Sequence, residues 1–148
     1  RARIVTEKLV SVYAQIVAMN LIIYGIAVGS VTAVGETVPW KELSLLHLAY
    51  FLLQAELAGI CFGISAFVRR GSAGIGLGIA AGMYFLNLVA NIAQAAEFLK
   101  YVTPFGYAEG ADIIEKGCLD GGLVAIGLAL GAAGIGAAYG KYCGKDVR

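Results

Sequence analysis

The sequence is short of charge, cysteine and histidine, and each shortage argues against a class of protein. Only 14% of its 148 residues are charged and the formal net charge is +1, so it has no broad field to attract nucleic acid or an acidic substrate. Its three cysteines and single histidine form no CxxC or Cys/His spacing. We expect no metal site, no internal disulfide and no nucleic-acid partner.

Sequence patterns for nucleotide binding and catalysis are also missing. Gly140 and Lys141 are followed by Tyr142, and Ile135 stands where a phosphate-binding loop needs its first glycine. One histidine without a Cys/His cluster offers little material for a catalytic triad. We therefore do not expect an enzyme or a cofactor held by this chain itself.

Apolar surface, by contrast, is abundant. Hydrophobic residues make up 59% of the chain, and its mean hydropathy is +0.80. A soluble domain of this size leaves most side chains near water and cannot hide so much apolar surface. The surrounding solvent is therefore lipid, and we expect a single all-α transmembrane domain over residues 1–148.

Four apolar stretches are long enough, at about 20 residues or more, to cross a bilayer as helices. They are residues 9–35, 43–68, 71–96 and 121–139. The first residue is Arg1 rather than Met, and no signal peptide precedes the first stretch, so we expect the chain to be a piece of a longer protein.

The segment between the third and fourth stretches, 97–120, is too polar to span and is expected to be re-entrant or interfacial. Thr103 followed by Pro104 is typical of a helix start. With helical spacing, Tyr107, Ala111 and Ile114 share an apolar face. The pattern predicts a short amphipathic helix lying at the outer membrane surface.

Lys and Arg are distributed unequally between the ends of the expected helices, and this predicts orientation. Eight of the eleven basic residues gather on one side: Arg1, Arg3, Lys8, Arg69, Arg70, Lys141, Lys145 and Arg148. Because positively charged loops stay on the inner side, both termini are expected in the cytoplasm, with the chain passing several times through the plasma membrane.

Glu56 stands alone as a carboxylate near the middle of an apolar stretch, where an ionised group must be paired, neutralised or turned to the bundle interior. Partners are expected from other helices, and the candidates are Asn87, Asn91, Tyr84 and Tyr24. Two interpretations stay open. These side chains line a polar path for substrate or protons, or they form interhelical hydrogen bonds that fix helix register.

Glycines recur four residues apart, a spacing that lets helix backbones approach closely in lipid. The pairs and triplets include Gly25 and Gly29, Gly59 and Gly63, Gly74, Gly78 and Gly82, and Gly127 and Gly131. They serve either generic packing or a specific helix-pair or dimer contact.

The order of these features resembles the membrane subunit of ABC-2 type ABC exporters, in the C-terminal four of its six spans. The resemblance covers essentially the whole chain. It lies in four segments: RIVTEKL at 3–9, GISAFVRR at 63–70, YVTPFGY at 101–107 and ADIIEKG at 111–117.

The resemblance implies a permease that forms half of a substrate path, pairs with a second permease copy or paralogue, and is driven by ATPase subunits that bind the ATP. In this chain Lys8, Arg69 and Arg70 remain to contact such an ATPase. Two alternatives are a self-contained four-span secondary transporter, proton-coupled through Glu56, and a membrane scaffold subunit that uses its glycine faces. Nothing in the sequence identifies the transported substrate.

Overall fold

The structure is a computed structural model and describes residues 2–68, 72–92 and 103–144. These residues are helical apart from short connections, and no strand occurs among them. The all-α class predicted from the sequence is therefore confirmed for the described part of the chain. The elements in chain order are α1 (Ala2–Ala33), α2 (Trp40–Ser65), α3 (Ser72–Ile92), η2 (Pro104–Tyr107), α4 (Gly110–Lys116) and α5 (Gly121–Cys143).

Three of the described helices, α1, α2 and α5, are long and apolar enough to cross a membrane. They correspond to the first, second and fourth predicted spans. The third predicted span, 71–96, contains α3, whose apolar stretch Gly74–Val89 is shorter than the other three. Large apolar side chains are exposed on these helices, and only Val5 is buried on α1. Such an exterior matches hydrocarbon rather than water.

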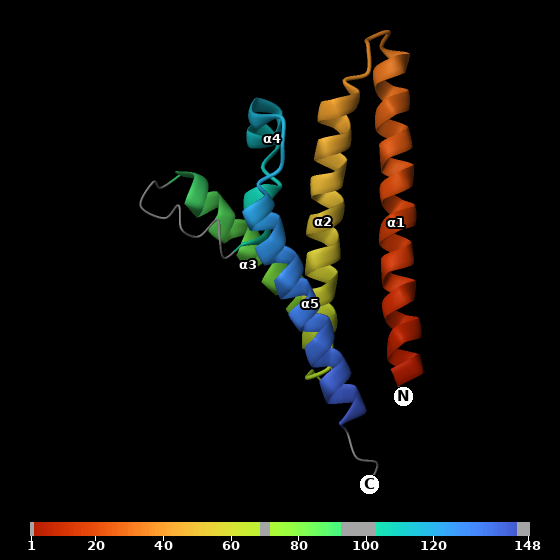
Figure 1. Cartoon of the computed structure of the whole chain (residues 1–148), viewed down its shortest axis with the longest axis vertical. Coiled ribbons are helices and arrows are strands. Elements are labelled where there is room, and N and C mark those ends of the chain that lie inside the picture. The colour runs from red at the N-terminus through yellow and green to blue at the C-terminus, as the bar shows by residue number, and fades with distance from the viewer. Residues whose placement is uncertain (1, 69–71, 93–102, 145–148) are drawn as a thin grey trace.

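α1 and α2 form an antiparallel hairpin and lie side by side (Figure 1). α1 ends in a Schellman motif: Gly35 adopts a φ of 81°, its N–H reaches the carbonyl of Thr32, and the N–H of Glu36 reaches Val31. Pro39 then precedes the first turn of α2. We call the end of the bundle at residues 34–39 the hairpin end.

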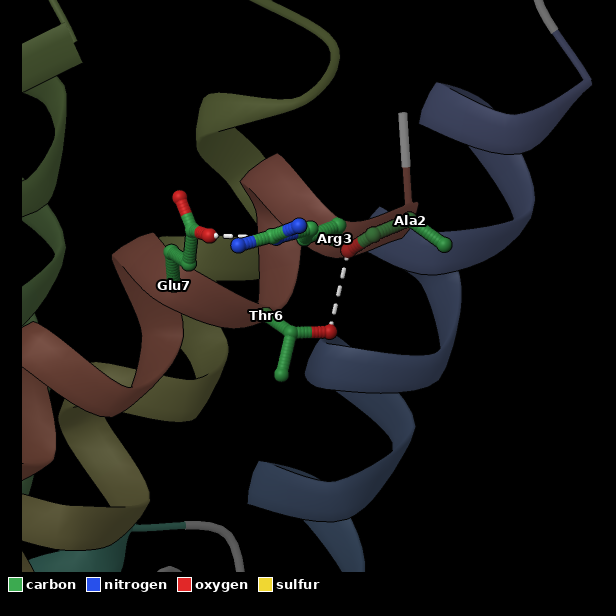
Figure 2. A network of polar contacts seen from close by, with 4 residues as sticks. All are labelled: Ala2, Arg3, Thr6 and Glu7. Carbon is green, nitrogen blue, oxygen red and sulfur yellow. Dashed lines mark hydrogen bonds and ion pairs between the residues drawn. The ribbon is translucent and has the colours of Figure 1, made fainter.

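α1 begins seven residues before the predicted start at residue 9, and its first turns hold polar contacts (Figure 2). The Arg3 guanidinium pairs with Glu7 at 2.9 Å, and the Thr6 hydroxyl donates to the carbonyl of Ala2 at 2.9 Å. Thr6 also shares a 2.7 Å hydrogen bond with the Tyr139 hydroxyl of α5. The start of α1 and the last turns of α5 therefore lie at one end, which we call the termini end (Figure 1).

The described part of the connection between α3 and α5, residues 103–117, runs from the middle of α2 towards the hairpin end. Tyr107 reaches Glu56 on α2, Gly110 lies against Leu46, and Gly117 lies beside Lys41 near the hairpin end. We call residues 103–117 the re-entrant segment. Tyr107, Ala108 and Ile113 join Ala49 and Leu53 of α2 in a small apolar core, so one face of the segment is packed against α2. In Figure 1, α4 lies level with the first half of α2.

The predicted apolar face of the re-entrant segment is wrong in its details. The 3-10 helix η2 ends at Tyr107 and α4 begins at Gly110, so the helical phase is reset between them. As a result Ile113 is buried, whereas Ala111 is exposed and Ile114 is 57% exposed. Gly117 ends α4 in the left-handed conformation with a φ of 61°, as a C-terminal glycine does.

α5 begins with a side-chain cap and has the same chain direction as α2. Asp120 Oδ1 accepts hydrogen bonds from the backbone N–H groups of Gly122 (2.9 Å) and Leu123 (3.2 Å). From there α5 crosses α2 obliquely towards the termini end (Figure 1). It continues to Cys143 rather than stopping at residue 139, because the last turn of a helix accepts a basic side chain such as Lys141.

Candidate functional site

At Gly59 and Gly63 of α2, the contact with α5 is made by backbone rather than by side chains. A Cβ added at Gly59 would lie 2.6 Å from the carbonyl oxygen of Gly131, and one at Gly63 would lie 2.6 Å from that of Gly134. Real Cβ atoms do not approach a carbonyl oxygen so closely. We call this contact the glycine seam. Any side chain at Gly59 or Gly63 would force the two helices apart.

Glu56 lies at the edge of the glycine seam nearer the hairpin end. It is 1% exposed, the most buried large side chain among the described residues. Gly127 and Gly131 of α5 make room for it: a Cβ at Gly127 would collide with Glu56 Oε2, and one at Gly131 would lie 3.2 Å from the Glu56 Cα. The carboxyl group therefore occupies space that exists only because α5 carries glycine there.

Tyr107 of the re-entrant segment is the hydrogen-bond partner of Glu56. Its hydroxyl donates to Glu56 Oε2 at 2.9 Å, and Tyr107 is itself 5% exposed. An apolar interior disfavours the charged form of a buried phenol. The phenol thus keeps its proton and acts as the donor. Glu56 Oε1 is buried and has no hydrogen-bond partner in the part of the chain that the structure describes.

α3 contacts η2 and the residue that precedes it. The Thr103 hydroxyl donates to Asn87 Oδ1 at 3.4 Å, a long hydrogen bond between two buried side chains. The ring of Tyr84 packs edge-on against that of Phe105, with centroids 5.6 Å apart. η2 therefore lies between α3 on one side and Glu56, at the contact of α2 and α5, on the other.

Not all of the polar residues predicted to meet Glu56 do so. Tyr24 shares a 3.0 Å hydrogen bond with Ser44 and packs edge-on against His47, closer to the hairpin end. Tyr84 and Asn87 reach the turn but not Glu56 itself, as far as the described contacts go. The side chain of Asn91 lies outside the described residues.

The depth of α1 relative to α2 explains the position of Tyr24. Tyr13, rather than Tyr24, lies level with Glu56, because its hydroxyl donates to the carbonyl of Ala55 at 2.9 Å. Between them, Asn20 Nδ2 donates to Gln54 Oε1 at 2.7 Å. α1 ends at Ala33 rather than at residue 35 and α2 begins at Trp40 rather than at residue 43, so Tyr24 lies closer to the hairpin end, and Glu56 further from it, than predicted.

The predicted packing glycines fall into two groups. Gly59, Gly63, Gly127 and Gly131 lie at the contact between α2 and α5. Five others have no described atom within 4 Å of an added Cβ: Gly25, Gly29, Gly74, Gly78 and Gly82. Of the basic residues expected to contact an ATPase, Lys8 is exposed near the termini end, while Arg69 and Arg70 lie outside the described residues.

Sequence reasoning missed Tyr107 and Gly127 as partners of Glu56. The position of Glu56 in an apolar stretch predicts a partner. The sequence pattern, however, places Tyr107 on a helix at the membrane surface and Gly127 only in a glycine pair. Within the described ranges no three His, Cys, Asp or Glu side chains form a metal-binding group. The arrangement is a buried carboxyl group with one hydrogen bond, suited to holding a proton or fixing helix positions.

Beside the seam, α2, α3 and α5 line an open apolar groove of about 650 Å³. Its lining includes Ile60, Met83 and Leu130, and Phe67 lies on it near the termini end. Lys141 Nζ lies 5.4 Å from the centre of the Phe67 ring. Glu56 is not part of the lining, so this apolar space and the buried polar site are separate features.

Comparison of the chain with models of protein families, with curated protein sequences and with solved structures finds no match in any of the three. Its function is therefore inferred from its own residues and geometry.

Proposed function

We propose that this chain is the transmembrane permease portion of an ABC-2 type exporter and forms half of its substrate path. The observation that carries the proposal is the re-entrant segment. It packs against α2, and its Tyr107 hydroxyl donates a hydrogen bond to the buried carboxyl of Glu56. The segments that carry the family resemblance around this region, YVTPFGY and ADIIEKG, largely form it. A packed re-entrant element between two spanning helices is a feature of proteins that move solutes rather than of simple anchors.

In this proposal α3 is the third of four spans, together with α1, α2 and α5, and the termini end faces the cytoplasm of a cell whose plasma membrane holds the protein. Described basic residues support the orientation: Arg3, Lys8 and Lys141 lie at the termini end, whereas Lys41 and Lys116 lie at the hairpin end. The re-entrant segment then faces outward, and its helix α4 is the outer loop helix.

The partners in this proposal are a second permease copy or paralogue and two ATPase subunits that supply ATP hydrolysis. Glycines with no described neighbour within 4 Å of an added Cβ support a further helix partner: Gly25 with Gly29 on α1, and Gly74, Gly78 and Gly82 on α3. For the ATPase contact we propose Lys8 together with Arg69 and Arg70.

ATP hydrolysis by the assembled complex tests the proposal. An affinity-tagged chain, extracted from its native membrane in mild detergent, is expected to carry an ATPase subunit with a G-x-x-x-x-G-K-[ST] loop. The hydrolysis activity of the purified complex should disappear when the loop lysine of that subunit is replaced. Recovery of the chain without such a subunit and without hydrolysis would contradict the proposal.

A charge reversal locates the ATPase contact. We expect Lys8→Glu to lower the amount of ATPase subunit that co-purifies with the chain. Lys41→Glu, the matched reversal at the hairpin end, should leave it unchanged. Equal effects of the two variants would assign the loss to general destabilisation rather than to the termini end.

The buried carboxyl also favours a second candidate, a secondary transporter in which Glu56 exchanges protons with substrate. Reconstituted vesicles containing only this chain would then show proton-coupled transport that Glu56→Gln abolishes. ATP-dependent transport that persists in Glu56→Gln would favour the exporter.

A further inference from the structure

Glu56 has no counter-charge near it among the residues that the structure describes. The described basic residues lie at the two ends of the bundle, and His47 is directed to the ring of Tyr24. The titratable groups on elements packed near Glu56 are the phenols of Tyr107 on η2 and Tyr13 on α1. α5 contributes Gly127 and Gly131, which have no side chain to charge.

The two carboxyl oxygens of Glu56 differ in a way that indicates its protonation state. Oε2 accepts the hydroxyl proton of Tyr107, as the carbonyl oxygen of a carboxylic acid does. Oε1 is buried and meets no donor among the described groups, although an ionised carboxylate would need one there. Burying an unpaired charge in lipid costs more than burying a neutral acid with one unmet hydrogen bond.

We propose that Glu56 is a proton-binding site inside the helix bundle and that the re-entrant segment, through Tyr107, is its cover. The proton resides on Oε1, and Tyr107 donates to Oε2. Release is a simple dissociation: the O–H bond at Oε1 breaks, its electron pair stays on the carboxylate, and the proton passes to a water molecule that has entered the site.

Water can reach Glu56 only if one of the groups packed against it moves, and the two groups compared are the α5 backbone and Tyr107. The α5 wall is backbone held in the glycine seam, with no side chain to swing aside. Tyr107 belongs to a helix of four residues that is joined to α4 through a break in the helical phase. Exchange of the proton therefore requires displacement of Tyr107, which places the exchange path towards the hairpin end. This inference does not rest on the proposed exporter function.

Infrared difference spectroscopy of the purified chain in lipid vesicles tests the protonation state. A protonated carboxylic acid has a C=O stretch that is separated from the bands of ionised carboxylates. We expect the wild-type spectrum at neutral pH to contain that band and the Glu56→Gln spectrum to lack it. Glutamine keeps the size of the side chain and an oxygen acceptor for Tyr107. Absence of the band from the wild type, or its persistence in Glu56→Gln, would overturn the proposal.

A second set of variants tests the cover and does not depend on folding of the Glu56 variant. Tyr107→Phe keeps the ring but removes the hydrogen bond, so the acid band should move, while Tyr24→Phe should leave it in place. Tyr107→Ala opens the site, so hydrogen–deuterium exchange of the acid proton should be at least tenfold faster than in the wild type and in Tyr24→Ala. Equal exchange rates in all three proteins would show that Tyr107 does not cover Glu56.

Discussion

Replacing Gly59 by alanine is the most direct test of the glycine seam. The new Cβ would lie 2.6 Å from the carbonyl oxygen of Gly131 and 3.0 Å from its carbonyl carbon, whereas ordinary contacts begin at 3.4 Å. α2 and α5 must separate by close to 1 Å at this point, with loss of dispersion contacts along the seam. Overpacking of this kind costs about 1–3 kcal/mol.

The matched control is Gly25→Ala on α1, where an added Cβ meets nothing within 4 Å. Alanine is favoured over glycine in a helix by about 1 kcal/mol, so this variant should be as stable as the wild type or slightly more stable. Thermal unfolding of the two variants in one detergent, followed by size-exclusion chromatography of the surviving fraction, measures the difference. If Gly59→Ala unfolds at the same temperature as Gly25→Ala, α2 and α5 are not in backbone contact.

Three further changes probe the site and its supports. Gly127→Ala would place a methyl group on Glu56 Oε2 and should lower the unfolding temperature, whereas Gly136→Ala on the same helix, with open space around it, should not. Tyr107→Phe should cost about 1–3 kcal/mol by leaving a buried carboxyl without its donor, and the cost should shrink in a Glu56→Ala background, as a double-mutant cycle in the same unfolding assay would reveal. Asp120→Ala removes the cap of α5 and should cost about 0.5–2 kcal/mol in that assay, and Asp120→Asn should restore most of it, since asparagine also accepts from the backbone.

Hydrophobic runs predicted the helices well but not their ends. Charged residues set the predicted boundaries. In the structure, α1 ends where Gly35 adopts a positive φ, and α2 starts directly after Pro39. Likewise Arg3 and Glu7 lie inside α1, because a helix that leaves the membrane continues as long as its polar side chains find partners. Membrane boundaries and helix boundaries are set by different forces.

One member of the site, Glu56, could be predicted from the sequence, but its partner could not. Composition singled out Glu56 because a lone carboxylate in an apolar helix needs a partner, but nothing in the spacing assigned that partner to Tyr107. The relevant geometry arises from the phase break between η2 and α4, which depends on tertiary contacts with α2. Similarly, several glycine pairs share the spacing for close contact, and only the fold decides that Gly59 and Gly63 meet α5 while Gly74 and Gly78 have no close neighbour among the described residues.

The glycine seam also limits how this protein can change shape. Where the two helices touch through their main chains, no side-chain rotamer can switch between them, so α2 and α5 are expected to move together as one rigid unit. α1 and α3, which share fewer contacts with that unit, are the parts free to swing against it. Spectroscopic labels on α2 and α5 should therefore keep a constant separation through any working cycle, while a label on α3 changes its distance to both.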